Sequence, residues 1–200
     1  MATTVKGERT KARIVLAAAD LIAKHGVAGT SLDDVRERTS TSKSQLYHYF
    51  PDKTALLRDV VLRQAERVFA AQRPTLDHLD SWAAIERWCD ELVAGKEKQR
   101  FHGSCPIGSL VTELAEVDPI ARANLAASFE RWEGFLASGL AKMKTRGELV
   151  PSADPQKLAV ATIASFQGGV LLAQATRSTE PLRIALDAAI RHLRSWAAKP

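Results

Sequence analysis

Residues 30–53 constrain the fold more than any other part of the chain, because they predict two short helices joined by a tight turn. Ser31 and Ser42 are each followed, three residues later, by an acid or amide side chain that can complete a capping box. Residues 39–41, with the sequence Thr-Ser-Thr, are poor helix formers and favour a break between the helices. The segment is therefore predicted to be a helix-turn-helix.

The apolar residues of this segment mark the helix faces that we expect to be buried. Leu32 and Val35 supply such a face for the first helix, and Leu46, Tyr49 and Phe50 supply one for the second. The side chains left outside on the second helix are small or hydrogen-bonding groups, as a helix that enters a DNA groove requires: Lys43, Ser44, Gln45, Tyr47 and His48.

From about Arg9 to Leu57, the chain resembles the TetR family of one-component transcriptional regulators. The resemblance rests on residues 42–50, Ser-Lys-Ser-Gln-Leu-Tyr-His-Tyr-Phe, and on residues 52–57, Asp-Lys-Thr-Ala-Leu-Leu. The family usually has glycine at positions 40 and 44 and an aliphatic residue at position 41. Here these positions are Ser40, Ser44 and Thr41, so Ser40 must adopt the turn geometry that glycine normally supplies.

The resemblance implies an all-α protein of about nine helices, with a helix-turn-helix DNA-binding domain at 1–57 and a ligand-binding and dimerisation domain at 58–200. Such proteins bind palindromic operators in double-stranded DNA as homodimers, and most are repressors that a small-molecule effector releases from DNA. The last two long helices, expected from Pro155 and Pro181, would form the dimer interface; the alternative is that they are the buried core of a monomer. Small residues would let these helices approach closely: Ala159, Ala161, Ala164, Gly168, Gly169 and Ala173.

The composition agrees with an all-helical protein. Of 200 residues, 46% are apolar and only 6% aromatic, and no long run of alternating β-branched residues predicts strands. The N-terminus lacks an apolar leader, and polar residues interrupt the most apolar stretch, so we expect a cytoplasmic protein that does not enter the membrane. Beyond the helix-turn-helix, helices are expected at about 53–71, 81–98, 106–116, 119–146, 155–177 and 180–198.

The charge of the chain favours DNA as a partner. The formal net charge is +5, and residues 1–60 carry ten cations against seven acids. Lys6, Arg9, Lys11 and Arg13 cluster near the start of the first helix, where they can reach backbone phosphates. The alternative for these four residues is an ordinary solvated N-terminus.

The second helix of the helix-turn-helix is predicted to enter the major groove of DNA. Gln45 can pair bidentately with adenine, and Lys43 can bind guanine or a phosphate. Tyr47 and His48 resemble phosphate clamps, although partial burial is an alternative for Tyr47. With helix capping as the main role of Ser31, the predicted DNA-binding residues are Thr30, Ser31, Ser42, Lys43, Ser44, Gln45, Tyr47, His48 and Lys53.

The larger domain carries aromatic residues at helical spacing that can line an effector site. Plain core packing is an equally good interpretation of each aromatic residue. No carboxylate pair or cationic cluster stands out among them, which favours an apolar or aromatic effector, and we expect no cofactor. The candidate ligand-binding residues are Trp82, Trp88, Phe101, Cys105, Phe129, Trp132, Phe135, Phe166 and Gln167.

Residues 103–106, Gly-Ser-Cys-Pro, place Cys105 directly before a proline that is expected to begin a helix. Free N–H groups at a helix start stabilise a thiolate. A Gly-x-Cys-Pro segment here resembles a subgroup of these repressors that includes sensors of electrophiles or oxidants. The alternative is that Cys105 is a small buried residue, as Cys89 is expected to be.

Two rival functions stay open from the sequence. Cys105, His102 and Glu113 can be imagined as the nucleophile, base and orienting acid of a cysteine-dependent enzyme. No oxyanion-hole glycine loop accompanies them, and the five histidines show no metal-binding spacing, so we expect neither an enzyme nor a metal site. The other rival is a helical module that binds a protein partner. The polar outer face of the second helix and the basic residues near the N-terminus argue against it.

Overall fold

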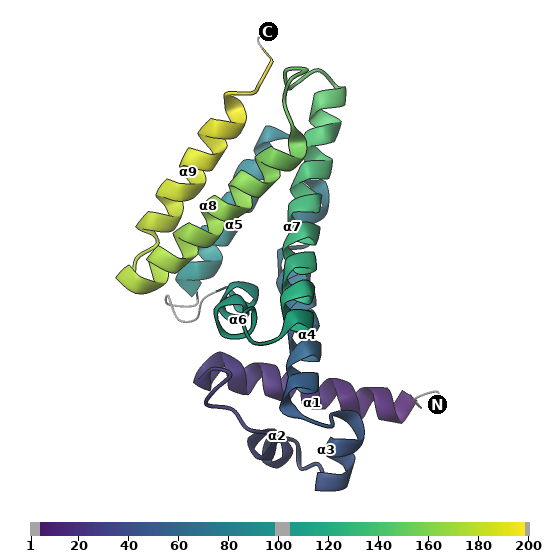
Figure 1. The fold of residues 1–200 in the computed structure, drawn as a ribbon. Helices are drawn as coiled ribbons and strands as arrows, with labels where there is room; N and C mark the ends of the chain where they lie inside the picture. Colours follow the sequence, from purple (N-terminus) through teal and green to yellow (C-terminus); the bar gives the residue numbers. More distant parts are fainter. Residues whose placement is uncertain (1–4, 99–104, 199–200) are drawn as a thin grey trace. The chain divides into compact units, whose positions relative to one another are not determined.

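A computed structural model describes residues 5–98 and 105–198 of the chain. In those residues the backbone forms nine α-helices and one short 3-10 helix, and the only strand-like pairing is an isolated antiparallel bridge between Leu149 and Ala197. The all-helical prediction is confirmed. The helices, shown in Figure 1, are α1 (Val5–His25), α2 (Leu32–Thr39), α3 (Lys43–Tyr49), α4 (Lys53–Gln72), η1 (Thr75–His78), α5 (Trp82–Lys98), α6 (Pro106–Leu114), α7 (Pro119–Thr145), α8 (Pro155–Thr176) and α9 (Glu180–Arg194).

The chain divides into two compact units. One comprises Met1–Val68 and Ser109–Ser128, and the other comprises Phe69–Gly108 and Phe129–Pro200. The first unit therefore contains the end of α6 and the start of α7 as well as the N-terminal helices. Helix α4 runs through residue 57 without a break, and the domain boundary predicted there stays a prediction.

Apolar residues at helical spacing hold the first unit together. Helices α1 and α2 pack against each other, and the buried positions predicted within residues 30–53 are buried, except that Leu32 and Tyr49 stay partly exposed. The buried residues include Ile14, Ala18 and Ile22 of α1, Val35 of α2, Leu46 of α3, and Phe50 directly after α3.

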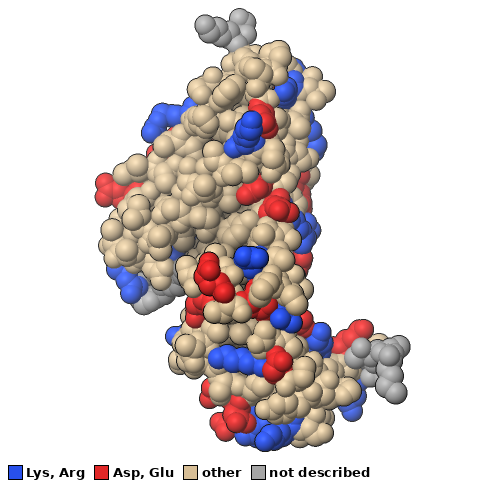
Figure 2. Space-filling model, viewed as in Figure 1, with Lys and Arg blue, Asp and Glu red and all other residues tan. Residues whose placement is uncertain are grey.

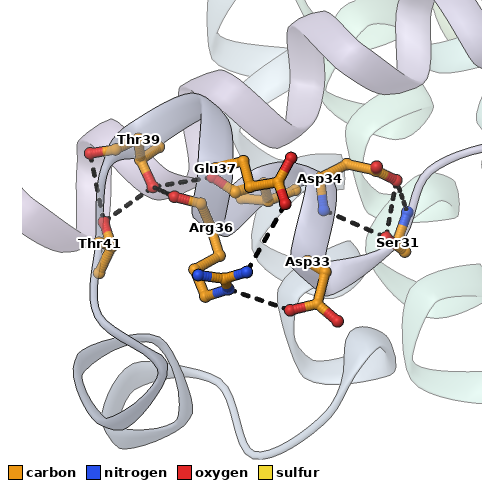
Figure 3. Close-up of polar contacts among 8 residues, drawn as sticks. Ser31, Asp33, Asp34, Arg36, Glu37, Thr39 and Thr41 are labelled. Carbon is orange, nitrogen blue, oxygen red and sulfur yellow. Dashed lines mark hydrogen bonds and ion pairs between the residues drawn. The ribbon is translucent and has the colours of Figure 1, made fainter.

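The turn between α2 and α3 is built from polar residues. Ser40 has a left-handed backbone, with φ 51° and ψ 35°, so the predicted turn geometry is confirmed. Thr39 and Thr41 are buried, yet both hydroxyls are satisfied. Thr41 donates to Thr39 Oγ1 at 2.7 Å, and Thr39 donates to Val35 O at 2.8 Å. Figure 3 shows the hydrogen-bonded pair, with Thr39 at the end of α2 and Thr41 just after it.

In the second unit, α8 and α9 lie side by side and run in opposite directions, as Figure 1 shows. Gly169 allows the close approach, because a Cβ placed on it would lie 3.0 Å from both Cα and Cδ1 of Leu182. Ala159 and Ala173 of the same helix are also fully buried. Three of the predicted small residues therefore serve packing within the subunit.

Helix α8 also has an apolar face that the described residues of the chain leave exposed. Val160, Leu171 and Leu172 are 43%, 64% and 55% exposed, and Ala164 and Gly168 are exposed beside them. Among the helices of the described residues, only α8 is long and apolar enough to span a membrane, with a mean hydropathy of 1.5. In the fold, 44% of its most apolar stretch is buried. One buried and one exposed apolar face account for this composition.

Neighbouring glycines of α8 provide a matched test of this packing. Gly169→Ala should lower the free energy of unfolding by about 1–3 kcal/mol, because its methyl group would collide with the α9 backbone. Gly168→Ala, whose new methyl meets no atom of the subunit within 4 Å, should cause no comparable loss. Urea unfolding of both variants, followed by circular dichroism at one protein concentration, measures the difference. Equal losses would contradict the close contact at Gly169.

Candidate nucleic-acid interface

Helix α3 presents its polar side chains as one exposed face. It has only seven residues, too few for a helix to be stable alone. Its first turn is capped, because Ser42 Oγ accepts from Gln45 N–H at 3.2 Å and Ser42 N–H donates to Gln45 Oε1 at 3.3 Å. Leu46 is 1% exposed and anchors the opposite face. The predicted contact residues of this segment are all exposed: Ser42, Lys43, Ser44, Gln45, Tyr47 and His48.

Two of these side chains have neighbours that bear on DNA recognition. Gln45 Oε1 accepts a hydrogen bond from the cap, but an amide oxygen has two lone pairs and the amide nitrogen is a separate donor. Bidentate pairing with adenine is therefore compatible with the cap. Tyr47 is 45% exposed, and the Lys43 ammonium lies 6.0 Å from the centroid of its ring. Tyr47 is thus available to a phosphate rather than buried.

A second capping box begins α2 and is drawn in Figure 3. Asp34 N–H donates to Ser31 Oγ at 3.1 Å, and Ser31 N–H donates to Asp34 Oδ2 at 2.7 Å. Hydrogen bonds from the Ser31 hydroxyl and N–H hold the pKa of the Asp34 carboxyl below its usual range. Thr30 differs, because it is buried and its hydroxyl donates to Gly26 O at 3.0 Å. The prediction that the Thr30 side chain contacts DNA conflicts with this burial.

Lys53 and Glu113 hold one residue of the α1–α2 loop from both sides. Lys53 Nζ donates to Val27 O at 2.6 Å, and Val27 N–H donates to Glu113 Oε2 at 2.7 Å. We call this arrangement the Val27 clasp. The sequence predicts a phosphate contact for Lys53 but contains no signal for Glu113, which lies 86 residues from Val27. An ammonium has three N–H donors, and the clasp uses one of them.

An ion pair between a partly exposed arginine and a buried carboxylate joins α4 to the start of α7. Arg58 donates to both carboxylate oxygens of Asp118, with Nε–Oδ2 and Nη2–Oδ1 distances of 2.9 and 3.1 Å. The Asp118 side chain is only 5% exposed and also accepts from Ile120 N–H at 3.0 Å, which caps α7. The hydrogen bond from Arg58 holds the pKa of Asp118 below its usual range.

The four cations near the start of α1 divide into two kinds. Lys6 and Arg9 are exposed. Lys11 Nζ instead lies 2.6 Å from a carboxylate oxygen of α4, and Arg13 donates to Thr39 O at 2.9 Å. Figure 2 shows Lys and Arg side chains interspersed with acidic ones on the visible face of the first unit. Attraction to phosphate therefore depends on individual cations rather than on a uniformly basic surface.

Four of the predicted effector-site residues, Phe129, Trp132, Phe135 and Phe166, come together in the second unit. The Trp132 ring stacks on Phe129 with an interplanar angle of 15° and centroids 6.4 Å apart, and it meets Phe166 edge-on at 5.4 Å. Phe69, which is not among the predicted residues, meets Trp132 at 6.0 Å and Phe135 at 5.7 Å. We call these five residues the aromatic cluster.

The predicted tryptophans differ in how their indole N–H groups are satisfied. Trp88 is fully buried, and its Nε1 donates to Gln72 Oε1 at 2.8 Å. Trp82 is partly exposed, with the Arg194 guanidinium 4.9 Å from its ring centroid. Trp132 is 1% exposed, and no acceptor among the described residues reaches its Nε1. A buried donor in that state costs about 1–3 kcal/mol.

Cys105 and Gln167 meet at the start of α6. Gln167 Nε2 lies 3.5 Å from Cys105 Sγ, and a Cβ on Gly108 would lie 2.8 Å from Gln167 Oε1. Cys105 is buried. Burial lowers the pKa of Lys96 on α5.

The remaining candidates carry less chemistry. Burial raises the pKa of the Cys89 thiol to about 12, so it is an inert core residue. Phe101 and His102 lie outside the described residues. In the part of the chain that the structure describes, no group of three or more His, Cys, Asp or Glu side chains is arranged to hold a metal ion.

The buried Asp118 carboxylate makes the stability of the first unit depend on pH. Because its pKa is lowered on folding, it stabilises the protein above its ordinary pKa of about 4. That stabilisation is lost as the pH falls through the folded value. Asp118→Asn should therefore be less stable than the wild type at pH 7, and the gap should narrow below about pH 4.

Urea unfolding at pH 7 and below about pH 4 measures the difference in the free energy of unfolding between Asp118→Asn and the wild type. Asp20→Asn is the control, since the Asp20–Arg67 pair has a similar N–O distance of 3.0 Å but both partners are 44–49% exposed, and it should change little. A gap for Asp118→Asn that stays constant with pH would contradict the role of its charge.

Comparison with known proteins identifies the family. The model for bacterial regulatory proteins of the tetR family matches residues 14–60, and the model for the C-terminal domain of LmrA/YxaF-like transcriptional regulators matches residues 81–188. An uncharacterized HTH-type transcriptional regulator in the lacX 3′ region of Lactococcus lactis is 30% identical over 183 residues, or 89% of this chain and 90% of that protein.

Two further proteins are similar over most of their length. The HTH-type transcriptional repressor DhaR of Mycobacterium sp. strain GP1 is 25% identical over 159 residues, covering 80% of this chain and 79% of that protein. A crystal structure of a TetR transcriptional regulator from Chloroflexus aurantiacus is 26% identical, with a TM-score of 0.81 and coverage of 97% and 98%. With a family model matching more than half of it, the chain is a DNA-binding transcriptional regulator of the TetR family and not an enzyme.

Proposed function

We propose that this regulator is a cytoplasmic homodimeric repressor that binds a palindromic operator and is released by a small-molecule effector bound in its second unit. The observation that carries the DNA part of the proposal is α3. Its capping box and the buried Leu46 hold a seven-residue helix in place, while its polar side chains remain exposed. A helix of this kind fits the major groove of DNA.

The side chains of α3 divide between bases and phosphates. Lys43, Ser44 and Gln45 lie at the leading end, where Gln45 can pair with adenine and Lys43 with guanine or phosphate. Ser42, Tyr47 and His48 contact the phosphate backbone of DNA. The exposed Ser31 at the start of α2 and Lys53 at the start of α4 do the same. The buried Thr30 is left out of this set.

Replacing one base-reading and one phosphate-binding residue tests this division. Gln45→Ala should cost about 1–3 kcal/mol on the operator and relax the preference at one base pair, with little change on random DNA. Lys53→Ala should weaken binding to both kinds of DNA and reduce the salt dependence of the affinity by about one phosphate contact. Fluorescence anisotropy on an operator selected from genomic DNA and on random duplex, at several salt concentrations, measures both effects.

Lys157→Ala removes an exposed cation from α8 and serves as the control, which should leave binding to both DNAs unchanged. Equal losses on operator and random DNA for Gln45→Ala and Lys53→Ala would contradict the proposed roles.

For the dimer, we propose that a second copy of the chain covers the exposed apolar face of α8 and α9. Val160, Leu171 and Leu172 of α8 and Ile184 of α9 are 43–64% exposed, and the surface over α8 in Figure 2 is largely uncharged. Contiguous exposed apolar residues of this kind mark interaction surfaces. A twofold dimer would also present two α3 helices to half-sites about 34–36 Å apart, or a multiple of that.

Leu171→Glu tests the dimer face, because it would place a carboxylate in the proposed apolar contact. The variant should be monomeric at micromolar concentration and should lose operator affinity, since one α3 alone binds weakly. Sedimentation velocity measures the oligomeric state. Val117→Glu changes a residue that is 74% exposed outside α8 and α9, so it should remain dimeric. A dimeric Leu171→Glu would contradict the proposal.

For the effector site, we propose the aromatic cluster together with the neighbouring Gln167 and Cys105. The support is that Trp132 contacts both Phe129 and Phe166, whereas the indole N–H of Trp88 is satisfied by Gln72. Trp82, beneath Arg194, is assigned to packing rather than to the ligand. The effector is thus expected to be mainly apolar.

A second release signal, a thiol-reactive electrophile at Cys105, is supported by the Gln167–Cys105 contact and by the position of the thiol at the start of α6. Addition to the thiolate would displace Gln167. The other end of α6 carries Glu113, which belongs to the Val27 clasp. A shift of this helix would therefore disturb the loop that precedes α2.

Cysteine replacement separates the electrophile signal from a reversible ligand. Cys105→Ser should bind the operator normally but should no longer be released by N-ethylmaleimide. Cys89→Ser should still be released, because burial raises the pKa of Cys89 to about 12 and keeps its thiol unreactive. Anisotropy of the protein–operator complex during the reaction measures release. Release of Cys105→Ser by the reagent would rule out this signal.

A further inference from the structure

We propose that the effector is an uncharged aromatic molecule with a hydrogen-bond-accepting oxygen, and that the indole N–H of Trp132 binds this oxygen. The inference rests on the proposed function, in that it takes the aromatic cluster to be the effector site. It goes further by naming the chemistry of the ligand and the atom that selects it.

The indole of Trp132 is the reason to expect an acceptor. Its Nε1 is the one buried side-chain nitrogen or oxygen in the described residues that has no hydrogen-bond partner. Native proteins satisfy nearly all such groups, so each exception calls for an explanation. Trp88 shows that the same unit can satisfy a fully buried indole, since Gln72 accepts from it at 2.8 Å. Because an indole N–H only donates, the missing partner must be an acceptor.

The surroundings of Trp132 favour an aromatic ligand. Phe129 stacks nearly parallel to the indole, while Phe69 and Phe166 meet it edge-on at 6.0 and 5.4 Å. An additional flat ring can use the same stacked and edge-to-face contacts. Phe129 is the half-buried ring of this group, so movement of its side chain is the simplest way to open the face of Trp132.

The charges around the cluster disfavour a cationic effector. The Arg131 guanidinium lies 4.8 Å from the centroid of Phe69, and that of Arg73 lies 5.7 Å from the centroid of Phe135. Both positive charges already occupy ring faces of the cluster. An anion would have to leave water for an apolar site, and both guanidinium groups lie on the outer rings, Phe69 and Phe135, rather than on Trp132. A neutral molecule with a carbonyl-type oxygen matches the apolar rings and the single donor.

Matched pairs of small probes test the acceptor directly. The pairs are acetophenone with ethylbenzene, 2-acetylnaphthalene with 2-ethylnaphthalene, and benzophenone with diphenylmethane, so that each ketone has a hydrocarbon of nearly the same shape. Calorimetric titration of the full-length, DNA-free protein should show at least one ketone binding about tenfold more tightly than its hydrocarbon.

Substitution of the donor supplies the second part of the test. Trp132→Phe keeps an aromatic ring but removes the N–H, so the preference for the ketone should disappear. Trp82→Phe removes an indole outside the cluster and should keep the preference. In the wild-type protein labelled with 15N, the Trp132 indole resonance should shift with the ketone and not with the hydrocarbon. This signal does not depend on the variant folding.

The proposal is overturned if no probe binds, if ketone and hydrocarbon bind the wild-type protein equally, if Trp132→Phe keeps the preference for the ketone, or if the indole resonance responds equally to ketone and hydrocarbon. Operator binding is measured separately on the same protein. Ketone selectivity in a protein without a selective operator would refute the repressor proposal while leaving the ligand assignment intact. If only a charged ligand released a selective operator, the ligand assignment would be refuted and the repressor proposal would stand.

Discussion

The Val27 clasp is the contact on which the first unit depends most. One residue in the loop before α2, Val27, has its N–H bonded to Glu113 and its C=O bonded to Lys53. A loop backbone needs partners for both groups when it packs against other elements. The two side chains supply those partners, and in doing so they tie the loop to the start of α4 and to the end of α6. The Arg58–Asp118 pair adds a second tie, from α4 to the residue that precedes α7.

The two short helices of the helix-turn-helix, α2 and α3, gain their stability from their capped ends and from one buried face each. Helices α2 and α3 have eight and seven residues, and helices of that length do not form alone in water. Capping boxes at Ser31 and Ser42 satisfy their first N–H groups. Burial of Val35 and Leu46 then fixes their orientation. Because stability comes from these positions, the exposed side chains of α3 are free to serve recognition.

Much of the fold could be predicted, because its signals are local. Prolines, serine caps and apolar spacing mark the helices. The turn requires a left-handed backbone at Ser40, and Ser40 adopts one. The site was less predictable where its contacts are long-range. Nothing in the sequence indicates that Glu113 reaches Val27 or that Phe69 joins the aromatic cluster. Such contacts depend on the packing of whole helices, which periodicity does not specify.

The exposed apolar face of α8 has a consequence for gene control. In the proposed dimer, where a second copy covers Leu171 and its neighbours, the DNA-competent species is a pair of chains whose abundance, when dilute, rises with the square of the chain concentration. Promoter occupancy then responds to expression level more steeply than it would for a one-chain repressor. A threshold in the dose response would arise from the hydropathy of one helix, without any cooperative effector.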